Sequence, residues 1–224
     1  RSHYKLSAPQ TDTENCVAHN GSLIPVPGRD IFVQAWYQGG VSIVDFTDSA
    51  NPIEIAFFDR GPLDEEELIT AGYWSTYWYG GYIYGTEIAR GLDVFALEPS
   101  DFITENEIAA ASLKEANLTV NAQTQERVVW PAVPVVARAY MDQLERTNVI
   151  DTEQLQSLNE LLEQVDLMLS SSANANSRNI INDLDNFSEA MQNEGDERVG
   201  RTRARYLSLS STLDGIADQL RQRN

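Results

Sequence analysis

The sequence predicts a multidomain α+β fold, in which a partial β-propeller of two antiparallel blades is followed by a C-terminal four-helix bundle. Two observations lead to this prediction. A hairpin pattern near the start of the chain returns after about fifty positions, which is a repeat length of propeller blades. After Leu97 the spacing of apolar residues changes from two to about 3.6, as expected where strands give way to helices.

The clearest hairpin lies in residues 30–52. β-Branched and aromatic residues dominate from Ile31 to Trp36 and from Val41 to Phe46, and apolar residues alternate with others there. Strands with one buried face have this composition. Because Gly39 and Gly40 supply the positive φ angles that a short turn needs, we expect two antiparallel strands joined at this point.

The same hairpin occurs twice. A shift of 51 positions, from Gly40 to Gly91, places it on residues 81–99 without a gap. Repeats of this length with several strands each are typical of propeller blades, so we expect blades at about 17–60 and 68–99 within a domain of residues 1–100. The alternative is a pair of unrelated hairpins in a small β-sandwich.

Residues 40–48, Gly-Val-Ser-Ile-Val-Asp-Phe-Thr-Asp, followed by Asn51 and Pro52, resemble the LVIVD repeat of bacterial secreted or surface β-propeller proteins. Four further stretches resemble the last two blades of such chains: residues 19–20, 25–30, 34–40 and 82–95. The resemblance implies a propeller fold and an extracytoplasmic location in a bacterium, whether periplasmic, cell-surface or secreted. It implies no particular reaction, because the family is defined by its repeat.

The chain is strongly acidic, with 224 residues and a formal net charge of −18. Nucleic acids and anionic membranes are bound by patches of Lys and Arg, so we expect neither as a partner. No apolar run approaches the ~20 residues that span a bilayer.

The chain starts at Arg1 without methionine or a signal peptide, and two blades leave strand edges bare. We therefore expect missing N-terminal blades or another protein to cover them.

The segment Tyr73–Tyr84 holds seven aromatic residues. Trp74, Tyr77 and Trp78 form either an aromatic platform for sugars or apolar ligands, or the packing between adjacent blades. The sequence alone leaves both interpretations open.

His19 is the candidate metal ligand, because histidine is the commonest metal ligand in proteins. In the selenium-binding or methanethiol-oxidase proteins, a distant propeller family, histidines in related strand positions bind copper, which makes copper a candidate here. The acidic run 64–67 lacks the spacing of an EF-hand, although clustered carboxylates are what calcium selects. Neither place offers a complete ligand set, so no cofactor is predicted.

No Ser-His-Asp order, Gly-rich phosphate loop, HExxH or CxxC motif occurs, and no catalytic residue is predicted. We interpret Cys16, the lone cysteine, as a small buried residue. The candidate binding residues are polar or aromatic side chains in or near the predicted strands: His19, Asn20, Trp36, Tyr37, Trp74, Tyr77, Trp78, Glu87 and Arg90.

The second part of the chain is predicted to be helical. Thr104 and Glu107 have the spacing of a capping box that opens a short helix from Glu105 to about Lys114, within a helix-and-linker region of residues 101–130. In residues 131–224, four segments repeat apolar residues in steps of three and four, as the helices of an antiparallel bundle do.

These observations favour a non-enzymatic recognition or scaffolding module of a bacterial envelope or secreted protein, with the helical bundle as its docking domain. The alternative is the C-terminal part of a propeller enzyme or metal-binding protein, whose active site lies mostly in missing N-terminal blades.

Overall fold

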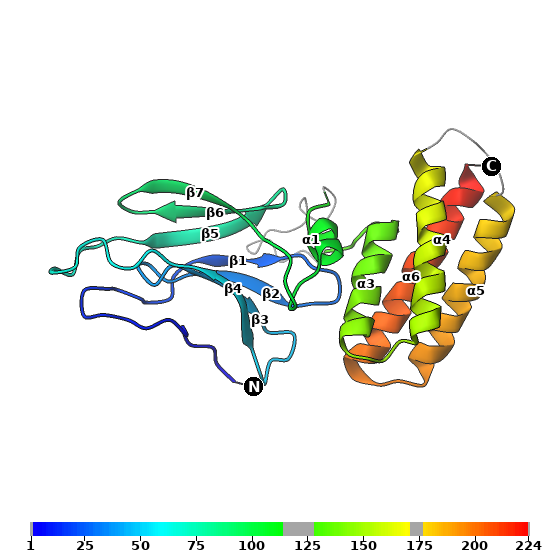
Figure 1. Cartoon of the computed structure of the whole chain (residues 1–224), viewed down its shortest axis with the longest axis horizontal. Helices are drawn as coiled ribbons and strands as arrows, with labels where there is room; N and C mark the ends of the chain where they lie inside the picture. The colour runs from blue at the N-terminus through cyan, green and yellow to red at the C-terminus, as the bar shows by residue number, and fades with distance from the viewer. Residues whose placement is uncertain (1, 114–127, 171–176, 224) are drawn as a thin grey trace. The chain divides into compact units, whose positions relative to one another are not determined.

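The computed structural model describes residues 2–113, 128–170 and 177–223 (Figure 1). The chain divides into two compact units, Arg1–Val129, here the β unit, and Trp130–Asn224, here the helical unit. Most of the predicted linker and the predicted loop at 171–176 lie outside the described residues.

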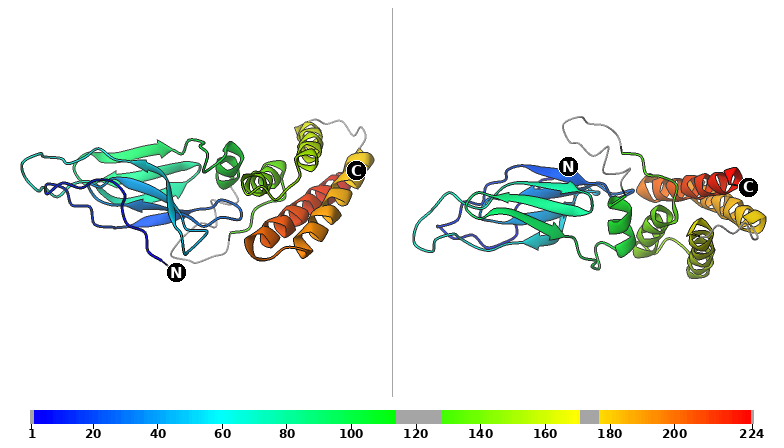
Figure 2. Two further views of the ribbon diagram at one scale, coloured as in Figure 1. Left: turned by 60° about the horizontal axis from the view of Figure 1, so that its bottom comes forward. Right: turned by 90° about the horizontal axis from the view of Figure 1, so that it is seen from above.

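The β unit contains two antiparallel sheets that lie as two layers (Figures 1 and 2). The first has the strand order β1 (Gly21–Ile24), β2 (Ile31–Ala35), β3 (Val41–Asp45) and β4 (Ile53–Phe58). The second has the order β5 (Tyr73–Tyr79), β6 (Tyr82–Glu87) and β7 (Gly91–Ala96). Alternate side chains of β2 and β6 are buried, as the period of two in the sequence predicts.

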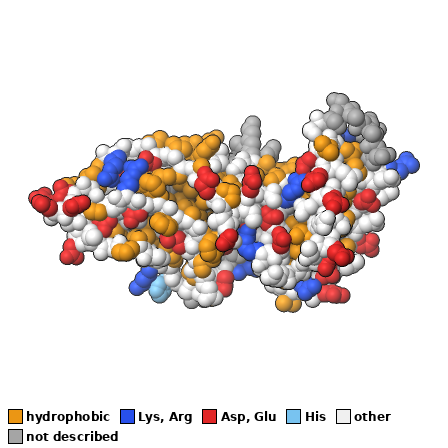
Figure 3. Space-filling view, in the orientation of Figure 1, with side chains coloured by type: hydrophobic (Ala, Val, Ile, Leu, Met, Phe, Trp, Pro, Cys, Tyr) orange, Lys and Arg blue, Asp and Glu red, His pale blue; other side chains and the backbone are white. Residues whose placement is uncertain are grey.

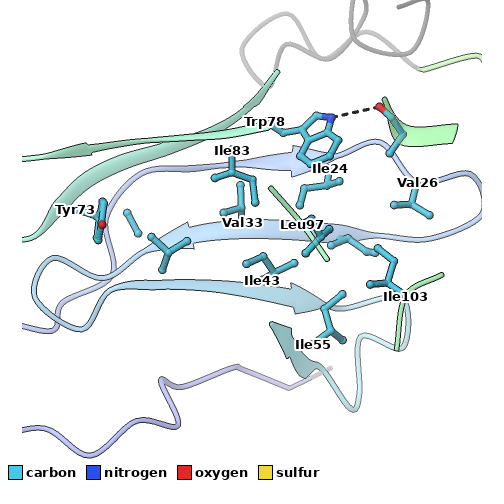
Figure 4. Packing of buried hydrophobic residues seen from close by; sticks show 14 residues of the cluster. Ile24, Val26, Val33, Ile43, Ile55, Tyr73, Trp78, Ile83, Leu97 and Ile103 are labelled. Carbon is cyan, nitrogen blue, oxygen red and sulfur yellow. Dashed lines mark hydrogen bonds between the residues drawn. The ribbon is translucent and has the colours of Figure 1, made fainter. Parts of the chain in front are cut away.

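One hydrophobic core lies between the two sheets (Figure 4). Val33 and Ile43 enter it from the first sheet, and Trp78 and Ile83 enter it from the second. The indole Nε1–H of Trp78 donates a hydrogen bond to the carbonyl oxygen of Ala111 (3.3 Å), which satisfies the polar atom of a buried ring. Each sheet thus covers the apolar face of the other.

The two layers are joined along β1 and β5. Asn20 forms a parallel bridge with Ser75, and the backbone N–H of Trp78 donates to the hydroxyl oxygen of Ser22 (2.9 Å). On the other side, β4 pairs only with β3 and β7 only with β6 among the described strands. The sandwich is therefore closed along one flank and open along the other.

Helix α1 (Glu105–Ala111) covers one end of the core. The predicted capping box is confirmed: the N–H of Glu107 donates to the hydroxyl of Thr104, and the Glu107 carboxylate accepts from the N–H of Thr104. The helix ends at Ala111, earlier than the predicted Lys114. Arg29 ties α1 to the first sheet, because its guanidinium contacts Asp45 at 2.6 Å and Glu107 at 2.9 Å.

The helical unit contains α3 (Pro134–Arg146), α4 (Thr152–Ser170), α5 (Ser177–Asp196) and α6 (Gly200–Gln222) in its described residues. Helices α5 and α6 lie side by side (Figures 1 and 2). The apolar stripes are buried at their predicted positions, as at Leu158, Leu162 and Val165 of α4. Within the described ranges, no helix combines the length and the hydropathy needed to cross a membrane.

The predicted fold class, two propeller blades followed by a four-helix bundle, is wrong. The described residues form sheets of four and three strands and five helices, one of which, α1, belongs to the β unit, and no closed propeller is present. The shift of 51 residues carries β2 onto β6 and β3 onto β7. It carries β4, however, onto residues 104–109, where the capping box starts a helix instead. The second sheet therefore lacks a fourth strand, and the two sheets share a single core.

Candidate functional site

The side of the second sheet that faces away from the core carries a continuous group of aromatic and aliphatic side chains. Cross-strand neighbours bring them together, since Tyr77 lies opposite Tyr84 and Tyr79 lies opposite Tyr82. We call this surface the tyrosine face, and define it by the residues that share it across three strands: Tyr77, Tyr79, Tyr82, Tyr84, Thr86, Leu92, Val94 and Ala96.

The tyrosine face is uncharged and open to solvent. The exposed fraction reaches 64% for Tyr79, 61% for Leu92 and 53% for Val94, while Tyr84 at its centre is half-buried. None of its eight residues is Asp, Glu, Lys, Arg or His, although the chain as a whole carries a net charge of −18. Adjoining exposed apolar side chains on one sheet mark binding surfaces more often than scattered ones do.

Three predicted site residues meet next to this sheet, where β1 and β5 are joined. The His19 ring lies 4.3 Å from the ring of Trp74 and 5.1 Å from that of Tyr37, measured between centroids. His19 Nδ1 is 2.6 Å from the carbonyl oxygen of Trp74 and must donate to it, because a carbonyl only accepts. A β-bulge at Tyr73/Ser75 leaves Trp74 without a partner on β6 and half-exposed.

The metal predictions at His19 and at residues 64–67 stay predictions. In the part of the chain that the structure describes, no three side chains of His, Cys, Asp or Glu gather where they could hold a metal ion together.

Burial, with smaller contributions from Glu14 and Asp59, raises the pKa of the half-buried Cys16 thiol to about 11. The thiol is therefore protonated at neutral pH and is a poor nucleophile.

The remaining predicted site residues have places inside the fold. Trp78 lies in the core, and Trp36 is buried with its ring edge-on to Tyr4. Glu87 is buried as well; it accepts a hydrogen bond from the N–H of Gly72 (2.6 Å) and pairs with Arg90 at 3.5 Å. The pair with Arg90 lies in the turn between β6 and β7, and the bond from Gly72 links this turn to the residue before β5.

Asn20 has a backbone role, through its bridge to Ser75. Of the tyrosine face, the sequence interpretation identified only Tyr77. It missed Tyr79 and Tyr82, which lie three residues apart across the tight turn between β5 and β6. It also missed Leu92 and Val94, which lie two residues apart on one face of β7. The alternation of Tyr82, Tyr84 and Thr86 along β6 was the available signal.

Comparison with known proteins adds no further evidence about the site. A scan against protein-family models and searches of the curated proteins and of the solved structures give no match.

Proposed function

We propose that the chain is a non-enzymatic recognition module, which binds a partner protein through the tyrosine face. The observation that carries this proposal is the uncharged group of four tyrosines, three of them exposed, with the exposed Leu92 and Val94 on one sheet. The centres of protein–protein interfaces are poor in charged residues and rich in tyrosine, and the tyrosine face has the same composition. Tyrosine is also enriched among the residues that contribute most binding free energy.

A protein partner fits this surface better than a sugar does. Sugar sites combine aromatic rings with several polar side chains that fix the hydroxyl groups. On the tyrosine face the non-aromatic polar side chain is that of Thr86, whereas Leu92 and Val94 offer only apolar area. Because the chain carries a charge of −18, we further propose that the partner is neutral or basic.

The resemblance of residues 40–48 to the LVIVD repeat supports placing this recognition function in a bacterial envelope or secreted protein. The role of the helical unit as a docking domain stays a prediction, and so does the alternative of an enzyme or metal-binding protein.

A photo-cross-linking amino acid at Tyr82, with a matched one at the exposed Leu167 of α4, tests where a partner binds. The partner protein identified by the cross-link is then purified, and the dissociation constant of its complex with this chain is measured by calorimetry. We expect Tyr79→Ser and Tyr82→Ser each to weaken binding by about 10- to 100-fold, which corresponds to about 1.4–2.8 kcal/mol. Leu167→Ser removes a similar apolar area elsewhere and should leave binding unchanged. Equal cross-linking at both positions, or equal losses for all three variants, would refute the proposal.

A further inference from the structure

An apolar groove of about 590 Å³ lies along the open flank of the β unit. In Figure 3, hydrophobic side chains gather on this unit between the two sheets. The groove is lined by side chains that belong to the core or pack against it, so the core itself reaches solvent here: Ile43, Ile55, Phe58, Ile83, Phe95 and Leu97.

The groove lies beside the position where the second sheet lacks a fourth strand. In the first sheet, β4 pairs with β3 and puts Phe58 opposite Val41. The equivalent edge of β7 has no neighbour among the described strands, and the residues after it lead into α1 instead. A strand edge with unpaired N–H and C=O groups is a template for pairing with another strand.

We propose that the groove binds an extended segment of a partner protein, which pairs antiparallel with β7 as β4 pairs with β3. Backbone hydrogen bonds to the β7 edge would hold the segment, while every second side chain enters the groove. Because the lining is mostly apolar, those side chains must be apolar.

The charges at the groove indicate which residues the segment should carry at the alternate positions, which do not enter the groove. Glu98, which is exposed, lines the groove, and no Lys or Arg is among the lining residues. The other acidic lining residue, Glu54, already accepts hydrogen bonds from the hydroxyls of Tyr4 and Ser42. Arg60 lies nearby, over the ring of Phe58, but it is paired with Asp93 at 2.8 Å. Leu97 enters the core and the next residue, Glu98, is exposed, so the Glu98 carboxylate lies on the outward side of this edge. Basic residues at the outward-facing, alternate positions of the segment can reach it and are therefore favoured.

A second copy of this chain fits less well than a foreign segment. Its net charge is −18, so two copies repel each other. Its own edge strands, β4 and β7, contain Glu54 and Asp93 and no Lys or Arg. The occupant is accordingly a separate protein with an extended segment that alternates apolar and basic residues.

The probe for this proposal is a capped heptapeptide that alternates Val and Lys, titrated into the full chain and followed by amide NMR shifts. We expect shifts concentrated in β4, β7 and residues 97–102. A peptide with the same composition in two blocks, and one with Glu in place of Lys, should each bind at least tenfold more weakly. Equal binding by either control peptide would overturn the proposal.

Two N-methylated probes test the backbone pairing directly. In a strand, the N–H groups of alternate residues point to the same side, so methylation of all Lys or all Val residues blocks one edge only. One of these peptides should lose at least tenfold in affinity and the other should not. If both lose the same or neither loses any, the segment does not add as a strand.

Variants of the protein separate this groove from the tyrosine face. Glu98→Lys should weaken binding of the Val-Lys peptide at least fivefold, whereas Glu65→Lys, the same charge change in an exposed loop, should change it less than twofold. Tyr79→Ser and Tyr82→Ser should leave peptide binding unchanged. Peptide shifts centred on those tyrosines, or dimerisation of the chain through this edge by sedimentation, would contradict the proposal.

Discussion

Gly40 and Gly91 both have positive φ, 81° and 97°, at the start of the third strand of each sheet. Their surroundings differ, however. A Cβ at Gly40 would lie 2.0 Å from the carbonyl oxygen of Phe58, while a Cβ at Gly91 would meet nothing within 4 Å. We expect Gly91→Ala to lower the free energy of unfolding by about 1 kcal/mol, through strain alone, and Gly40→Ala by at least about 3 kcal/mol. Urea unfolding measures both, and equal losses would contradict the difference in packing.

Arg29 is the cation between two carboxylates, and its side chain is only 4% exposed. Arg29→Met keeps much of the apolar stem but removes the cation that pairs with the carboxylates of Asp45 and Glu107. We expect a loss of about 3–5 kcal/mol in the free energy of unfolding, because the remaining charges stay buried. Thermal and urea unfolding should agree. A loss below about 1 kcal/mol would show that solvent reaches the two carboxylates.

Asp45 should also give the stability a dependence on pH. Burial by itself raises its pKa, but the charge of Arg29 and the hydrogen bonds from Thr47 and Arg29 outweigh it, so the pKa lies below the ordinary value of 3.8. A lowered pKa in the folded state stabilises the protein above the unfolded pKa, and this stabilisation is lost as the pH falls through the folded value. We expect the difference in unfolding free energy between wild type and Asp45→Asn to be constant above about pH 5 and to shrink below it. A difference that is unchanged at pH 3 would contradict the role of the charge.

At the scale of elements, the hydroxyl of Thr104 caps the N-terminus of α1. Thr104→Ala removes the side-chain cap on the N–H of Glu107 and should lower the free energy of unfolding by about 1 kcal/mol. Thr104→Ser keeps the hydroxyl and should lose much less. Urea unfolding of the three proteins provides the measurement, and equal values for Ala and Ser would show that the cap contributes nothing.

The individual elements were more predictable than their assembly. The shift from Gly40 to Gly91 located β2, β3, β6 and β7, because hairpin composition and turn glycines are local properties of the chain. The capping box at Thr104 was recognised, but its consequence was not: a helix at this place deprives the second sheet of its fourth strand. Which strand edges meet, as Asn20 and Ser75 do, depends on contacts between distant segments, and no local pattern encodes it.

The candidate site was predictable only in part for a related reason. Both faces of β5 and β6 carry aromatic or apolar residues, so alternation shows that two faces exist without showing which one is buried. The first sheet covers Trp78 and Ile83 and leaves Tyr77 and Tyr82 exposed. The exposure of an aromatic residue thus followed from the packing of the layers.

At the scale of the whole molecule, the helical unit should fold without the β unit. It has its own core, with Leu184, Met191 and Leu213 fully buried among its helices. Residues 130–224 expressed alone should show a cooperative, strongly helical thermal transition by circular dichroism. A gradual melt without a transition would mean that this core needs the rest of the chain.

The groove in the β unit is held at both ends. At one end the rings of Phe58 and Phe95 touch, with centroids 4.8 Å apart, and at the other Arg29 donates to the carbonyl oxygen of Phe102 (2.8 Å). Because these two contacts join the layers, the layers have little freedom to move apart. The width of the groove is therefore set by the fold before a segment binds. We therefore expect the groove to favour segments whose inward side chains fit the existing space, and replacement of the Val residues of the probe peptide by Trp should weaken its binding.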